Sequence, residues 1–116
     1  MGPSSINGFD QRKKAFEAKY LHDEELNFRI QAKRNRLFGL YAAELLGYKG
    51  KKAEQYVDEI ILVDLQKTQG EDVLHKVLKD LESAKVEISE HRLSKELERC
   101  WEMARDSVMS EEESSS

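Results

Sequence analysis

The turn from Gly47 to Lys52, with the sequence GYKGKK, is the segment best suited to hold an anion. It precedes an expected helix, and the first backbone N–H groups of a helix favour a bound negative charge. Gly50, Lys51 and Lys52 therefore form the candidate phosphate or nucleotide site. The spacing is not that of a P-loop, because the first glycine lies too close to the lysine and no Ser or Thr follows it. A plain helix–helix turn is the alternative, and no cofactor is expected beyond weak binding of ATP or ADP.

A compact basic patch, KRNR, occupies residues 33–36 and is the feature that favours nucleic-acid binding. Against this interpretation, the chain has a net charge of −4 and a pI of about 5.5. No nucleic-acid-binding motif is present, and the acidic run Asp23–Glu25 lies two turns before the patch. We expect no nucleic-acid partner, and a nucleic-acid-associated helical module stays an alternative.

The side chains that most often perform catalysis or bind metals are few and scattered. His22, His75 and His91 fall in three different expected helices, without the HExxH or CxxC spacing of metal sites. Cys100 is the single cysteine and has no neighbouring histidine, so a half-buried packing thiol is favoured over a nucleophile. It has no partner for an internal disulfide, which suits a reducing compartment. We predict no enzyme activity and no metal site.

The composition indicates that these residues are positioned by long helices. The 116-residue chain has one Pro and six Gly, and 36% of its residues are charged. Ala, Glu, Lys, Leu and Arg make up about half of it, as is typical of long-helix sequences. The longest apolar run, Ile60–Val63, is far shorter than the ~20 residues of a membrane-spanning helix. We expect an all-α, cytoplasmic protein without direct membrane insertion.

Four helices are predicted, at residues 10–46, 51–67, 71–84 and 89–108. Gly47 suits the left-handed position after the first helix, and Ser89 is the predicted N-cap of the fourth. Short loops between four amphipathic helices predict a compact antiparallel four-helix bundle with a long first helix. The apolar stripe of that first helix consists of Leu26, Ile30, Leu37, Leu40, Tyr41 and Leu45.

The N-terminal part of the first helix does not continue this stripe. Phe9, Phe16 and Tyr20 fall within about 40° of one another, in a direction rotated about 80° from the apolar stripe. A polar segment whose aromatic rings do not face the core is typical of a part that folds on a partner, and the alternative is that these rings pack on the bundle. We therefore divide the chain into a mobile segment 1–20, the bundle 21–108 and a disordered acidic tail 109–116.

Two motifs in the first helix resemble a known family. The pattern FxxRxxAFExKYxHDxELxFR begins at Phe9, and AKRNxLxGxYAAE begins at Ala32. Both resemble the DUF1476 family, the zeta subunits that inhibit the F1Fo-ATPase of α-proteobacteria. The resemblance covers about residues 9–100 and weakens in the leader 1–8 and from Trp101 onward.

The resemblance implies a regulatory subunit that inhibits ATP hydrolysis by the F1Fo-ATP synthase. In the family, a mobile N-terminal inhibitory segment enters the catalytic α/β interface beside the γ shaft, blocks rotation in the hydrolysis direction and largely spares synthesis. The implied partners are the F1 α, β and γ subunits, which would place a monomeric chain at the periphery of the inner membrane. A small nucleotide- or phosphate-binding module is the alternative. The residues implied to bind F1 are Phe9, Arg12, Lys13, Lys14, Phe16, Glu17, Lys19 and Tyr20.

Overall fold

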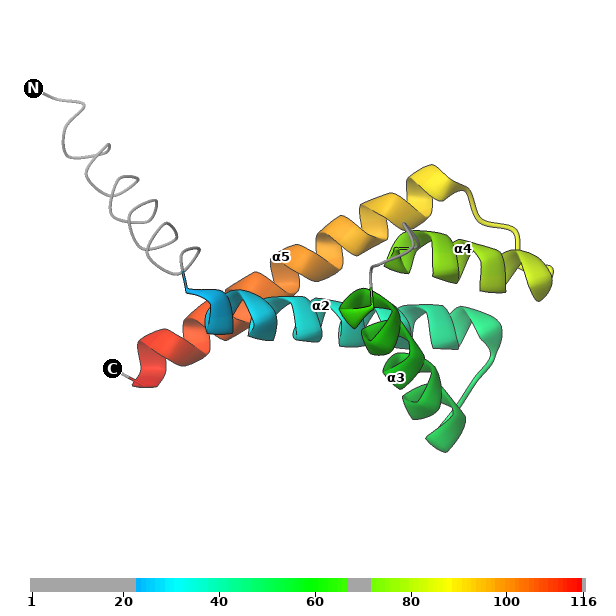
Figure 1. Cartoon of the computed structure of the whole chain (residues 1–116). Helices are drawn as coiled ribbons and strands as arrows, with labels where there is room; N and C mark the ends of the chain where they lie inside the picture. Colours follow the sequence, from blue (N-terminus) through cyan, green and yellow to red (C-terminus); the bar gives the residue numbers. More distant parts are fainter. Residues whose placement is uncertain (1–22, 67–71, 116) are drawn as a thin grey trace, which may run out of the picture.

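The computed structural model describes residues 23–66 and 72–115, and these residues form four helices. This confirms the predicted all-α class. No helix in the described part combines the length and the apolar character that crossing a membrane requires. The helices are labelled as in Figure 1: α2, Glu24–Leu46; α3, Lys51–Leu65; α4, Val73–Ser83; and α5, Glu90–Ser115.

Helix α2 is the centre of the bundle. It packs most extensively against α5 and α3, and α4 contacts α2, α3 and α5. Helix α5 runs back along α2, so that its C-terminal end lies beside the N-terminal half of α2 (Figure 1). The predicted antiparallel four-helix arrangement is therefore confirmed.

Local capping signals fix several of the helix ends. Gly47 has φ +81° and ends α2 in the left-handed conformation, as its position in the sequence predicted. The Ser89 hydroxyl accepts a hydrogen bond of 3.1 Å from the backbone N–H of Arg92, which confirms Ser89 as an N-cap. At the start of α2, the Asp23 carboxylate accepts hydrogen bonds from the N–H groups of Glu25 and Leu26.

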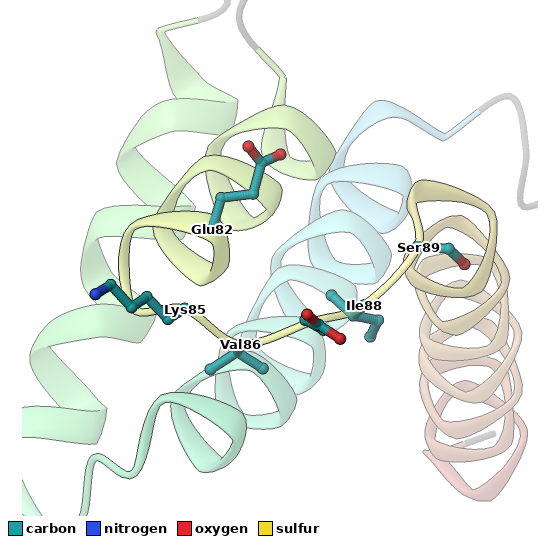
Figure 2. Close-up of a pocket in the computed structure, with 6 residues that line it drawn as sticks. Glu82, Lys85, Val86, Ile88 and Ser89 are labelled. Atoms are coloured by element: carbon teal, nitrogen blue, oxygen red, sulfur yellow. The ribbon is translucent and has the colours of Figure 1, made fainter.

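The connection between α4 and α5 reverses the chain with a lysine in the left-handed position. Lys85 has φ +62°, and the N–H of Val86 donates to the carbonyl of Leu81 at 2.9 Å. The N–H of Lys85 also donates to the carbonyl of Glu82 at 3.0 Å, and the two bonds form a Schellman motif. Glycine is the usual residue at the left-handed position of this motif. Figure 2 shows the open hollow beside this connection, bordered by Glu82 of α4 and Ser89 at the start of α5.

The buried residues form two clusters. The larger one, the four-helix region, receives side chains from all four described helices. The smaller one, the stem, lies between α2 and α5. The four-helix region contains Phe38, Ala42, Ala43, Tyr56, Ile60, Val73, Val77, Leu81, Leu93 and Cys100; the stem contains Leu26, Ile30, Ala104 and Val108.

The buried face of α2 differs from the predicted stripe in its C-terminal half. Leu45, predicted to face the core, is exposed. Small residues replace large ones at the contact because α3 comes close: a Cβ atom on Gly39 would lie 3.2 Å from the Cα of Val57. The predicted stripe left out Phe38, whereas the buried residues of this half of α2 are Asn35, Phe38, Gly39, Ala42 and Ala43.

Helix α5 is longer than predicted. Helix α2 ends at Leu46 as expected, although the predicted part 10–22 lies outside the described residues. Helices α3 and α4 keep the predicted positions within about two residues. The predicted end of the last helix at residue 108, and the disordered tail from 109, are wrong as far as Ser115. Glu111 and Glu112 near this end form ion pairs with Arg29 and Lys33 of α2, which offset part of the negative charge of α5.

Candidate functional site

The eight residues implied to bind F1, from Phe9 to Tyr20, lie outside the described residues. The structure therefore describes the base from which this segment leaves the bundle. That base is the first turn of α2, which starts at the N-cap Asp23 and carries the exposed carboxylates of Glu24 and Glu25.

Ion pairs join the next turns of α2 to the far end of α5. The Arg29 guanidinium donates to Glu112 and lies 3.4 Å from a carboxylate oxygen of Glu111. The Lys33 ammonium donates to the Ser107 hydroxyl at 2.6 Å and lies 3.5 Å from Glu111. These surface contacts add to the buried apolar residues of the stem that hold the N-terminal half of α2 against the end of α5.

The basic patch 33–36 does not form a free cationic surface. Arg34 lies 3.4 Å from the Asp64 carboxylate. Both Nε and Nη2 of Arg34 donate to the side-chain amide oxygen Oδ1 of Asn35. Arg36 pairs with Glu54 at 3.1 Å. With Lys33 held by α5, all three cations of the patch contact acidic or polar groups of neighbouring helices, and the expected absence of a nucleic-acid partner stays a prediction.

Asn35 is a buried polar residue that the sequence reasoning missed. It is 1% exposed, and its amide nitrogen donates to Asp64 at 2.9 Å. A buried amide without a partner costs free energy, so the bond to α3 fixes the relative position of α2 and α3. Its partner Asp64 lies 29 residues later in the chain, and no local pattern indicates such a pair.

A second polar cluster joins α3 to α4. The Tyr56 hydroxyl donates to Asp80 at 2.8 Å, and the Lys76 ammonium donates to the same carboxylate oxygen at 2.9 Å. Burial, and then the hydrogen bond to Asp80, raise the pKa of Tyr56. Burial lowers the pKa of Lys76, but the bond and charge of Asp80 outweigh it and the net pKa is raised. Both groups therefore keep their protons and act as structural donors.

The candidate anion site is a helix–helix turn with an aromatic contact. Gly50 has φ +56° and is the N-cap of α3, and Lys51 and Lys52 are exposed. The Lys52 ammonium lies 4.2 Å from the centre of the Tyr48 ring, as in a cation–π interaction. This geometry accounts for the turn without a ligand, and nucleotide binding at Gly50, Lys51 and Lys52 stays a prediction.

Cys100 packs as a thiol inside the four-helix region. It is 3% exposed, more deeply buried than predicted. Burial, followed by the charge of Glu96, raises the pKa of Cys100 to about 11. The thiol is therefore protonated at neutral pH, which agrees with a packing role. His75 contacts Asp72 and Glu90 at the surface, in a separate cluster.

In the described ranges, most of the polar clusters described above join one helix of the bundle to another. No curated protein matches the chain significantly. The family model of ATPase inhibitor subunit zeta matches residues 6–107. The chain belongs to this family, so it is a regulatory subunit associated with ATPase inhibition, and the resemblance of its two motifs is confirmed.

Proposed function

We propose that this chain inhibits ATP hydrolysis by the F1Fo-ATP synthase through residues 9–20, which fold into the catalytic α/β interface beside the γ shaft. The observation that carries the proposal is the family match, which begins at residue 6 and includes this whole segment. The second motif, from Ala32 to Glu44, already has a structural role as the contact surface of α2. In the first motif, the part from Asp23 onward also has structural roles in α2, and we assign the part from Phe9 to Tyr20 to the partner.

The bundle supports this division because the described residues have a hydrophobic core of their own. Leu26 is the first buried residue described, and the large core residues follow it in α2, α3, α4 and α5. A chain changed before residue 20 therefore keeps its core. This makes the bundle a carrier that stays folded while residues 9–20 change their surroundings.

Three aromatic residues are the proposed anchors in F1. Burying one aromatic or large apolar side chain contributes about 1.5–3 kcal/mol, while ordering each backbone residue costs about 1–2 kcal/mol. Loss of one ring among Phe9, Phe16 and Tyr20 is therefore expected to remove most of the net binding. The cations Arg12, Lys13, Lys14 and Lys19 would meet acidic groups at the rim and mainly increase the association rate.

The proposed partners are the α, β and γ subunits of F1, and the proposed location is the cytoplasmic side of the inner membrane. We propose no catalytic activity for the chain itself.

The test is ATP hydrolysis by purified F1 from the same cell, with the full chain added at increasing concentration. The full chain should lower hydrolysis, whereas Phe16→Ala and a chain lacking residues 1–19 should lose most of the inhibition and keep the helical circular dichroism spectrum. Met103→Ala is the matched control, because Met103 is an exposed apolar side chain on α5. Full inhibition by the shortened chain would assign the inhibitory element to the bundle instead.

A further inference from the structure

A small groove lies between α2 and α3, close to the point where residues 1–22 join the bundle. It encloses about 140 Å³. Asn35 and Asp64 contribute polar groups to it, and its other lining residues are Phe28, Gln31, Ala32, Ile61 and Leu65.

Two large apolar side chains at the rim of this groove are exposed to solvent. Phe28 is 54% exposed and Leu65 is 59% exposed, although both are large apolar side chains. They come from different helices and meet at one groove, so they form a shared surface. A surface with an apolar rim and a polar floor suits an aromatic side chain with neighbouring polar or cationic groups.

The length of the preceding chain indicates which occupant can reach the groove. Phe16 and Tyr20 precede Asp23 by seven and three residues, which allows extended spans of about 23 and 10 Å. Along α2, Phe28 and Ala32 lie about 8 and 14 Å from Asp23 at 1.5 Å per residue. Tyr20 is therefore within reach of the Phe28 end of the groove, and Phe16 is within reach of its Ala32 end as well.

The exposed charge beside the groove is complementary to that of the segment. Glu24 lies one helical turn before Phe28 on the same face of α2 and is exposed, whereas the Asp64 carboxylate in the groove is already paired with Arg34 and Asn35. The segment carries Lys14 and Lys19 beside its aromatic residues. Attraction between these groups favours docking of the segment over docking of an acidic partner.

From this we propose that, in the free protein, the chain's own residues 9–20 dock reversibly in the groove between α2 and α3 through Phe16 and Tyr20. This inference rests on the proposed function, because it adds a resting position for the inhibitory segment. The groove and F1 then compete for the same aromatic rings. The apparent affinity for F1 falls in proportion to the undocked fraction.

The docking is tested by paramagnetic broadening of amide NMR signals in the full chain. A spin label is attached to Ala18→Cys, and the native Cys100 is protected by burial. The label should broaden the amides of Ala32 and Ile61, and leave those of His91 and Arg92 on the exposed start of α5 unchanged. Leu65→Lys should abolish the broadening, whereas Met103→Lys, which adds the same charge to an exposed side chain on another helix, should not.

A mixing experiment separates docking within one chain from docking between chains. Labelled chains without ¹⁵N are combined with unlabelled ¹⁵N chains. Broadening in this mixture would show that a second copy occupies the groove and would overturn the inference. Absence of broadening in the mixture, with broadening in the singly labelled chain, supports it.

Inhibition of F1 provides the second measurement. If four-fifths of the free molecules are docked, Leu65→Lys should inhibit at a concentration about fivefold lower than the unaltered chain, and Met103→Lys should not differ. Unchanged groove amides would overturn docking, even where Phe16→Ala still abolishes inhibition and the proposed function stands. Conversely, broadened groove amides in a chain that never inhibits F1 would leave docking intact and contradict the proposed function.

Discussion

The stem and the four-helix region of this small protein differ in how they are held together. In the described residues, the four-helix region contains ten buried residues from four helices, whereas the stem contains four from two helices. Because hydrophobic stabilisation grows with the apolar area removed from water, most of the stability resides in the four-helix region. The stem joins α2 to α5 but contributes little buried apolar area to the core.

The polar interactions follow the same division. In the stem, the pair Arg29–Glu112 has side chains that are 41% and 32% exposed, so water and salt screen it. Between α2 and α3, the pair Arg34–Asp64 has side chains that are 19% and 12% exposed, and Asn35 completes its hydrogen bonds. The ion pair of the stem is thus exposed to water, whereas the pair between α2 and α3 is largely buried.

The proposed inhibitory segment precedes the less extensively packed of these two regions. Residues 1–22 join the chain at the stem, the region with the smaller core. Local opening of a weakly packed region costs less than global unfolding. Changes at the base of the segment are therefore expected to leave the four-helix region folded.

The largest predicted effect compares one substitution in both regions. Ile60→Ala in the four-helix region should lower the free energy of unfolding by about 4 kcal/mol, because four helices surround the cavity and limit its collapse. Ile30→Ala in the stem should cost about 2 kcal/mol, because two helices can move together. Urea unfolding followed by circular dichroism measures both. Equal losses would show that the two regions form one equally packed core.

An intermediate effect is predicted at alkaline pH. The folded-state pKa of Cys100 is raised to about 11, so above its ordinary pKa the thiol ionises more readily in the unfolded chain. Its contribution to stability is complete below about pH 9 and is lost as the pH rises toward 11, at a total cost of about 2 kcal/mol. Urea unfolding between pH 8 and 11 should show this loss, and Cys100→Ala should show less of it. An identical pH profile for both chains would contradict burial of the thiol.

The smallest effect is predicted for the surface ion pairs of the stem. Glu112→Gln should lower stability only slightly, because exposed pairs contribute little. The difference should shrink further in 1 M salt, where charges are strongly screened. Asp64→Asn, which alters the shielded pair with Arg34, serves as the comparison and should cost more in both salt conditions. A larger loss for Glu112→Gln than for Asp64→Asn would reverse the ranking of the two regions.

Much of the four-helix region was predictable because its signals are local. Gly47 and Ser89 marked helix ends through backbone geometry and a side-chain cap, and the structure confirms both. The apolar spacing of α4 is likewise local, because Val73, Val77 and Leu81 recur every four residues and are buried. These features depend on residues within one or two turns of each other.

The features that the sequence did not reveal depend on distant partners. The run of glutamates at the end of α5 by itself favours disorder. Its partners Arg29 and Lys33 lie about 80 residues earlier in the chain, so no local pattern indicated that it would be helical. Likewise, the basic patch suggested a binding surface until Asp64 and Glu54 of α3 were found beside Arg34 and Arg36. The candidate site 9–20 lies outside the described residues and stays a prediction.

The central claim is that residues 9–20 act on F1 while the four-helix region carries them unchanged. Amide hydrogen exchange of the full chain, free and bound to its own F1, tests this most directly. In the free chain, Ala15 to Tyr20 should exchange faster than Leu37 to Leu45. On binding F1, Ala15 to Tyr20 should become strongly protected while Leu37 to Leu45 stays as before. Equal protection of the two segments in the free chain, or protection by F1 only at Leu37 to Leu45, would contradict the claim.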